Sequence, residues 1–215
     1  MQKDMKLEWN LAFRIDHWVR FIAIVLLVIT GFYIHSPFMS GGTGGFLMGW
    51  MRFIHFLSAY ALILGLVVRV YLAFNSRFSG DWKDFSIMKN LAGVPDILSY
   101  YLFIKGTHKE YGRYNPLQAL AYLGMAIMIV FVSLTGAALY KGNLFGFINA
   151  ASSFAWVNRM FGGESYVRIW HYLSMWIFII FIFVHVYLSL MISASNRDKT
   201  FVSIFTGYKL KKKSA

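Results

Sequence analysis

The chain has 215 residues, of which 58% are hydrophobic, 19% aromatic and only 14% charged. With a mean hydropathy of +0.55, this composition excludes an ordinary soluble domain and indicates an integral membrane protein. The formal net charge is +12, which fits attraction to anionic membrane lipid, and we expect no nucleic-acid partner. Cysteine is absent, which excludes disulfides, iron–sulfur clusters, c-type haem attachment and thiolate chemistry, so any metal must be held by His or Met.

Four apolar stretches are each about 20 residues long, enough to cross a bilayer core of about 30 Å. They cover approximately residues 17–35, 51–74, 116–140 and 168–192. No convincing small-residue cleavage site follows the first stretch, so we expect a retained helix and not a signal peptide. The sequence therefore predicts an all-α fold, an integral membrane four-helix bundle that forms one transmembrane domain over residues 1–215.

Lys and Arg residues are distributed unevenly between the two sides of these spans. Most of the 21 lie on the side that holds both chain ends. The four on the opposite side are Arg52, Lys141, Arg159 and Arg168. Because cytoplasmic loops carry the excess of Lys and Arg, both termini are predicted to be cytoplasmic.

Two pairs of apolar segments repeat along the chain. They are residues 52–72 and 168–188, and residues 24–31 (IVLLVITG) and 129–136 (IVFVSLTG). The duplicated unit is therefore predicted to be a two-helix hairpin, with a pseudo-two-fold axis along the membrane normal. His55 and His171 occupy equivalent places in the repeat, near the outer ends of their helices, and are predicted to lie at similar depth.

The last span carries two His residues at helical spacing. His171 and His185 are 14 residues apart, close to four helical turns, so they project from nearly the same face about 21 Å apart. No single metal ion can bind both. His55 lies at the right depth to pair with His171, and His17 at the right depth to pair with His185. Two depth-matched His pairs without Cys are typical of two six-coordinate b-type haems between helices, an outer and an inner one.

Three cations are candidate partners for haem propionates. Arg69 stands where the second repeat has His185 and could meet the inner haem, while Arg52 and Arg168 each precede a His by three residues and could meet the outer one. A His in a membrane helix often only hydrogen-bonds to a neighbouring helix. A haem-free transporter or scaffold therefore stays open as an alternative. His35, beside a Gly-rich loop, is expected at the surface.

Two segments carry a family resemblance. Residues 14–31 (RIDHWVRFIAIVLLVITG) look like the first-helix signature of the b-type cytochrome subunit of membrane-bound nickel–iron hydrogenases. Residues 168–185 (RIWHYLSMWIFIIFIFVH) resemble the fourth-helix segment of that family with its two His residues. The resemblance covers all four spans. Related cytochromes b serve formate dehydrogenases and thiosulfate reductases, so another periplasmic oxidoreductase is the alternative partner.

The resemblance implies roles for the four His residues and a partner. His17 and His185 match the ligands of the haem nearer the cytoplasm, and His55 and His171 match those of the haem nearer the periplasm. The implied partner is a periplasmic hydrogenase with a large subunit and an iron–sulfur small subunit that carries an anchor helix, at the bacterial inner membrane. Electrons from hydrogen would pass through both haems to a quinone, either menaquinone or ubiquinone. The chain itself would carry no hydrogenase active site.

A quinone site is expected near the inner haem, where protons can arrive from the cytoplasm. The candidates are His108, Tyr114, Asn115 and Tyr187. The resemblance favours the positions of Asn115 and Tyr187. Asn115 can equally cap the third span, with Pro116 in its first turn. Tyr71 is the repeat partner of Tyr187, which leaves a purely structural role open for that tyrosine.

Three further segments are predicted to lie outside the bilayer core. Residues 81–105 mix charges and aromatics, as expected of helices on the inner membrane surface. Residues 142–166 lie on the outer side and are amphipathic enough to lie on the bilayer or to receive a partner. The basic tail at residues 209–213 (KLKKK) is expected to be solvated and attracted to lipid.

Overall fold

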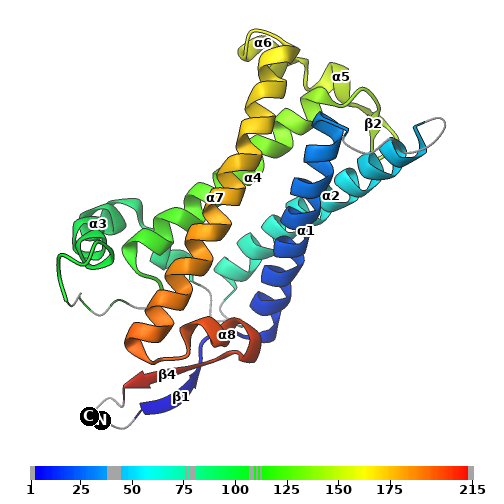
Figure 1. Ribbon diagram of the computed structural model, residues 1–215. Helices are drawn as coiled ribbons and strands as arrows, with labels where there is room; N and C mark the ends of the chain where they lie inside the picture. Colours follow the sequence, from blue (N-terminus) through cyan, green and yellow to red (C-terminus); the bar gives the residue numbers. More distant parts are fainter. Residues whose placement is uncertain are drawn as a thin grey trace. The chain divides into compact units, whose positions relative to one another are not determined.

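The computed structural model describes residues 3–37, 45–75, 77, 81–106, 109, 111 and 113–212. In this part of the chain, four helices are long and apolar enough to cross a membrane (Figure 1). They are α1 (Leu11–His35), α2 (Phe46–Phe74), α4 (Pro116–Leu139) and α7 (Glu164–Asn196). The four predicted spans are thereby confirmed as helices. Three of them, α1, α2 and α7, begin earlier than predicted, because each helix continues beyond the apolar window.

Shorter elements connect and flank these helices. They are η2 (Trp82–Phe85), α3 (Ile87–Tyr101), α5 (Ala150–Ser153), α6 (Ala155–Met160) and α8 (Thr200–Thr206), with strands β1 (Lys3–Leu7), β2 (Asn143–Leu144), β3 (Ile148–Asn149) and β4 (Tyr208–Lys212). The strands form two antiparallel pairs, β1 with β4 and β2 with β3. The chain is mostly helical, as predicted for a membrane helical bundle, and carries two small sheets in addition.

The chain groups into two compact units. Unit 1 comprises residues 1–65 and 130–215, and unit 2 comprises residues 66–129. Helices α2 and α4 each contribute to both units. The expectation of one transmembrane domain over the whole chain stays a prediction.

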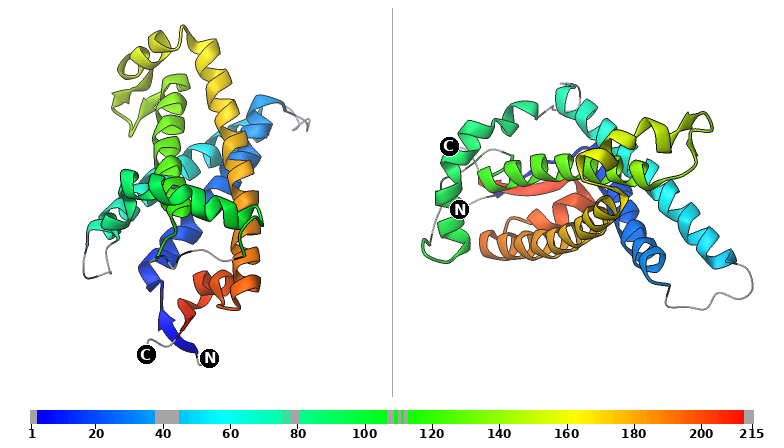
Figure 2. Two further views of the ribbon diagram at one scale, coloured as in Figure 1. Left: turned by 90° about the vertical axis from the view of Figure 1, so that its left-hand side faces the viewer. Right: turned by 90° about the horizontal axis from the view of Figure 1, so that it is seen from above.

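The end of unit 1 that holds β1 and β4 ties the two ends of the chain together (Figure 2). The carbonyl of Gly207 accepts hydrogen bonds from the backbone amides of Glu8 and Trp9 at 2.8 and 3.1 Å. Gly207 has φ 89°, and a Cβ there would lie 2.8 Å from the Trp9 carbonyl oxygen, so this position requires glycine. The tail that we expected to be solvated is thus paired with β1 as far as Lys212. This pairing places the start of α1 beside the chain that follows α7.

The segment between α4 and α7 closes the opposite end of unit 1. Its β2–β3 hairpin leads into α5 and α6, and Val157 of α6 packs with Ala138 and Val167 in a fully buried cluster. Asn158 donates a hydrogen bond to the Ala138 carbonyl at 3.1 Å. This segment therefore anchors the end of α4 to the start of α7.

Unit 2 contains the amphipathic helix α3, within the segment expected on the inner membrane surface. Ile97 is fully buried on one face of α3, whereas Met88 and Leu91 are exposed on another. A Cβ at Gly93 would clash with the ring of Pro116, so glycine allows α3 to approach the start of α4 closely. The structure confirms a helix in this segment, and its position on the membrane stays a prediction.

Candidate cofactor-binding site

Unit 1 brings the four His residues predicted as ligands together in two pairs. The rings of His17 on α1 and His185 on α7 have centroids 6.4 Å apart, with planes at 41°. The rings of His55 on α2 and His171 on α7 also lie 6.4 Å apart, with planes at 58°. These are the two pairs expected from helical spacing and depth. Because both pairs include a residue of α7, they are separated by about 21 Å along that helix.

The separation within each pair fits two ligands on opposite sides of one metal ion. A metal–imidazole bond is about 2 Å long and the ring nitrogen lies about 1 Å from the ring centre, so two such ligands have ring centres roughly 6 Å apart. Among the described residues, no group of three or more His, Asp or Glu side chains could hold a metal. Two protein donors per site suit a macrocycle that supplies the remaining ligands, as in haem.

Two threonines contact the Nδ1 atoms of the His55–His171 pair. Thr30 Oγ1 on α1 lies 2.8 Å from His55 Nδ1, and Thr135 Oγ1 on α4 lies 3.0 Å from His171 Nδ1. Both threonines are buried, with 2% and 0% of their surface exposed. They were not among the predicted site residues. The signal that could have found them is the Thr-Gly dipeptide that ends both repeated octapeptides, residues 24–31 and 129–136.

The glycine that follows each threonine lies against the same imidazole. A Cβ on Gly31 would lie 3.6 Å from His55 Cε1, and one on Gly136 would lie 3.0 Å from His171 Cε1. The second distance is too short for ordinary packing, so α4 can approach His171 this closely only with glycine at position 136. Each Thr-Gly dipeptide therefore supplies both a hydrogen-bond partner and space for a histidine ring.

The His17–His185 pair has different surroundings. His17 Nδ1 is buried and has no hydrogen-bond partner among the described residues. The His185 ring stacks on Phe181, with centroids 5.7 Å apart and planes at 13°. A buried ring nitrogen without a partner costs free energy. No described hydroxyl group holds this nitrogen, unlike Nδ1 of His55 and His171, so the fit of this pair to a metal centre rests on the separation of the two rings.

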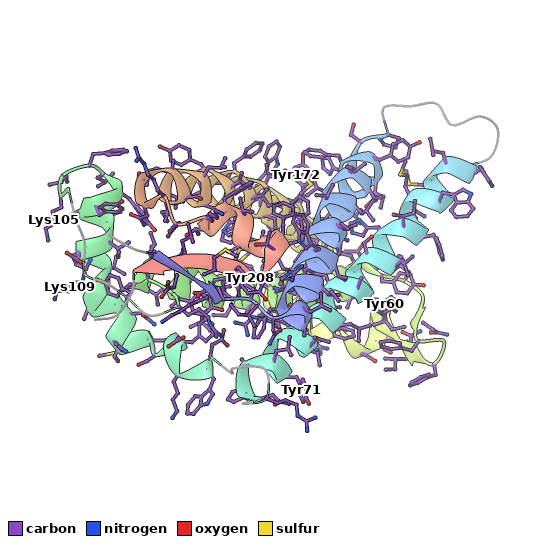
Figure 3. All side chains as sticks on the ribbon, turned by 90° about the horizontal axis from the view of Figure 1, so that it is seen from below. Tyr60, Tyr71, Lys105, Lys109, Tyr172 and Tyr208 are labelled. Atoms are coloured by element: carbon purple, nitrogen blue, oxygen red, sulfur yellow. The ribbon has the colours of Figure 1, made fainter. Side chains whose placement is uncertain are left out.

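The remaining His of α1 lies outside both pairs. His35 ends α1 and is exposed, as expected. Its ring stacks on Tyr172 of α7, which is labelled in Figure 3, with centroids 4.0 Å apart and planes at 21°. His35 therefore packs α1 on α7 and is not part of either His pair.

Two of the three predicted propionate partners already have a carboxylate partner. In unit 2, Arg69 donates to both carboxylate oxygens of Asp81, at 3.2 and 2.8 Å. In unit 1, Arg168 lies 2.9 Å from Glu164, one turn earlier in α7. Arg52 is exposed and makes no ion pair among the described residues. Propionate binding by these three cations stays a prediction.

A fourth arginine, not predicted, lies one turn from His17. Arg20 binds the buried carboxylate of Asp16 at 2.6 Å. A Cβ on Gly65 would lie 2.5 Å from Arg20 Cγ, so this glycine leaves room for the arginine stem between α1 and α2. The ion pair thus fixes the Arg20 guanidinium and its counter-charge one turn from His17, within α1 itself.

The quinone-site candidates differ in how far their polar groups are already used. Tyr114 is buried and donates to Asp81 at 2.6 Å, and burial raises the pKa of its hydroxyl far above the ordinary value, so it stays a proton donor. Tyr187 on α7 is 59% exposed. His108 lies outside the described residues. Of the described candidates, Tyr187 is the one whose side chain remains accessible.

Asn115 caps α4, which confirms the structural alternative for this residue. Its Oδ1 accepts from the backbone amide of Gln118 at 2.8 Å, and Gln118 Oε1 accepts from the backbone amide of Asn115 at 3.1 Å. This reciprocal arrangement is a capping box, with Pro116 at the first helical position. The side-chain amide of Asn115 also donates to Tyr101 Oη at 2.8 Å, which links α4 to the end of α3.

Asn115→Ala is expected to lower stability by about 1 kcal/mol, since it removes the cap acceptor. The melting temperature of the detergent-solubilised protein measures the effect. Asn115→Asp keeps the cap and loses only the donor to Tyr101, so it should recover most of the stability. A melting temperature for Asn115→Ala equal to that of the parent would contradict the assigned cap.

Comparison with known proteins places this geometry in a family. Residues 8–207 match the family described as prokaryotic cytochrome b561. The chain belongs to the prokaryotic cytochrome b561 family. Its four apolar helices are accordingly those of a multi-pass membrane protein, and the family name implies haem b as a cofactor.

Curated relatives resemble the chain over nearly its whole length. A protein named probable Ni/Fe-hydrogenase B-type cytochrome subunit from Azotobacter vinelandii is 34% identical over 204 residues, which cover 92% of this chain and 85% of the relative. A protein of the same name from Cupriavidus necator is 32% identical, with 91% and 83% covered. The probable Ni/Fe-hydrogenase 1 B-type cytochrome subunit of Escherichia coli K12 is 31% identical, with 91% and 87% covered. These relatives confirm the family resemblance noted in the sequence.

Proposed function

We propose that this cytochrome is the di-haem membrane subunit of a periplasmic nickel–iron hydrogenase and passes electrons from hydrogen to the quinone pool. The observation that carries the proposal is the pair of His–His contacts, each with ring centroids 6.4 Å apart. The relatives named Ni/Fe-hydrogenase subunits support this partner over a formate dehydrogenase. Membership in a cytochrome family argues against a haem-free transporter or scaffold.

In this proposal the residues of unit 1 hold two haem b groups at two levels. His17 and His185 would hold the haem of the inner site, and His55 and His171 that of the outer site. A bound haem b supplies one-electron redox chemistry. The apolar helices exclude water from the ligands and fix their rings, while Thr30, Thr135 and the following glycines set the distance between helices at the outer site.

The proposed topology gives each side of the membrane a separate task. With both termini in the cytoplasm, the His55–His171 pair faces the periplasm, where the small subunit of the hydrogenase would bind with its anchor helix. The His17–His185 pair then lies on the cytoplasmic side. Release of protons outside and uptake of quinone protons from inside would charge the membrane.

The proposed quinone site lies near the His17–His185 pair. Tyr187 follows His185 by two residues in α7 and presents an exposed hydroxyl, which suits a hydrogen bond to a quinone oxygen. Asn115, Tyr114 and His108 remain candidates, although the polar groups of Asn115 and Tyr114 already have partners within unit 2. Quinone activity retained by Asn115→Asp would restrict the role of that residue to the helix cap.

The proposal is tested by counting haem in the protein purified from membranes. A pyridine haemochrome assay should give about two haem b per chain, and a reduced-minus-oxidised spectrum should show b-type bands. One haem per chain would reject the di-haem assignment. A folded preparation without haem, after haem has been supplied, would reject the cytochrome function itself. Co-purification of the hydrogenase small and large subunits tests the partner.

A further inference from the structure

The hydroxyl groups of Thr30 and Thr135 have more than one acceptor within reach. Thr30 Oγ1 lies 2.6 Å from the Leu26 carbonyl in its own helix and 2.8 Å from His55 Nδ1. Thr135 Oγ1 lies 2.9 Å from the Phe131 carbonyl and 3.0 Å from His171 Nδ1. In both cases the shorter contact is to the carbonyl one turn earlier, a usual bond for threonine inside a helix.

A hydroxyl carries one proton, which determines the tautomer of the histidine beside it. When the threonine donates to the helix carbonyl, its oxygen can only accept from the imidazole, so Nδ1 must carry the proton. A neutral imidazole protonated at Nδ1 has its lone pair at Nε2. All groups in both contacts are then satisfied, and each Nε2 is left free to bind a metal.

We propose that Thr30 and Thr135 are positioning residues for the outer haem, which hold His55 and His171 with Nδ1 protonated and direct Nε2 to the iron. This inference rests on the proposed di-haem function. A ligand imidazole that donates a hydrogen bond from its second nitrogen is a stronger base toward the metal. A more basic ligand stabilises ferric over ferrous iron, so the two threonines lower the reduction potential of the outer haem.

In the described part of the chain, the inner site has no such hydrogen bond to a threonine, so the shift in reduction potential should be specific to the outer haem. His17 Nδ1 has no hydrogen-bond partner among the described residues. The two threonines lie on different helices, α1 and α4, and contact different ligands of the same proposed iron. Loss of either hydroxyl should therefore shift one haem only, and loss of both should shift it further.

Thr30→Val and Thr135→Val test the inference, because valine keeps the shape of threonine and removes the hydroxyl. In redox titrations of the purified cytochrome, each variant should raise the potential of the outer haem. We expect about a tenfold change in the ratio of ferric to ferrous haem at a fixed ambient potential, which is about 59 mV for a one-electron couple. The His185→Ala variant assigns the titration steps, since it should retain only the outer haem.

Two controls separate a ligand effect from a general disturbance of packing. Thr30→Ser and Thr135→Ser keep the hydroxyl and should restore the parent potential. Ser174→Ala removes a buried hydroxyl on α7 that donates to the Trp170 carbonyl at 2.8 Å. This variant should leave the potentials of both haems unchanged.

Each result decides between the inference and the function on which it rests. A raised outer potential with an unchanged inner one, reversed by serine, supports the inference. Loss of the outer haem in the valine variants, restored by serine, supports it as well. Two bound haems with unshifted potentials, equal shifts of both haems, or a change that serine does not reverse would overturn the inference alone. Absence of haem from the parent protein would overturn the proposed function and the inference together.

Discussion

Alanine at position 185 is expected to remove the inner haem and to abolish quinone reduction, while dye-linked hydrogen oxidation by the complex persists. The rings of His17 and His185 form the inner pair, with centroids 6.4 Å apart, so either substitution would leave one histidine to hold the inner haem. His17→Ala should therefore give the same phenotype. Haem content should fall to about half that of the parent, measured as pyridine haemochrome.

The other pair should fail in a different way. His55→Ala and His171→Ala should remove the outer haem and leave the inner one in place. His35→Ala is the matched control, because His35 is a histidine of α1 that stacks on Tyr172 and belongs to neither pair. It should retain both haems. Loss of the same haem from His17→Ala and His55→Ala variants would contradict the assigned pairing.

Asp81→Ala is expected to destabilise unit 2 by about 3–5 kcal/mol, because it leaves a buried guanidinium without its counter-charge. The Asp81 side chain is 1% exposed and accepts hydrogen bonds from Arg69 and from Tyr114. The Arg69 side chain is itself only 12% exposed and also lies over the Phe85 ring. The expected result is a large fall in melting temperature and in the yield of folded protein.

Asp96→Ala is the matched control for Asp81 within the same unit. Asp96 also binds a cation, Lys105, at 3.1 Å, and it accepts hydrogen bonds from the Lys109 amide and the Tyr111 hydroxyl. Lys105 and Lys109 are labelled in Figure 3. The partner lysine of Asp96 is exposed, so water replaces most of the lost interaction. A fall for Asp96→Ala as large as that for Asp81→Ala would contradict the importance assigned to burial. Arg69→Met in the Asp81→Ala background should recover part of the stability by removing the unpaired charge.

Sequence reasoning predicted the four spans and the two His pairs because both depend on properties local to a helix. A run of about 20 apolar residues needs no tertiary information to indicate a span. The 14-residue interval between His171 and His185 is close to a whole number of turns, so their common face follows from helix geometry alone. The repeat then related His55 to His171, and the structure places these two rings together.

Long-range pairings were not predictable in the same way. Strands β1 and β4 pair the two ends of the chain, which are far apart in sequence. Each segment is too short and too polar to predict a strand by itself. The partner of Arg69 was equally hidden. Asp81 is one acid in a segment that mixes charges and aromatics, and nothing in its sequence context distinguishes it from the other acids nearby.

The amino-acid sequence by itself indicated a membrane protein with four helices and predicted that its histidines form two pairs. The length of an apolar run and the helical period are properties of a single segment, so they can be read without knowing which segments pack against it. Only the tertiary structure decided that Thr30 and Thr135 bond the imidazoles of one pair, and that Asp81 binds Arg69. Those contacts depend on distances of about 3 Å between different elements, which hydrogen bonding demands and which no periodicity encodes.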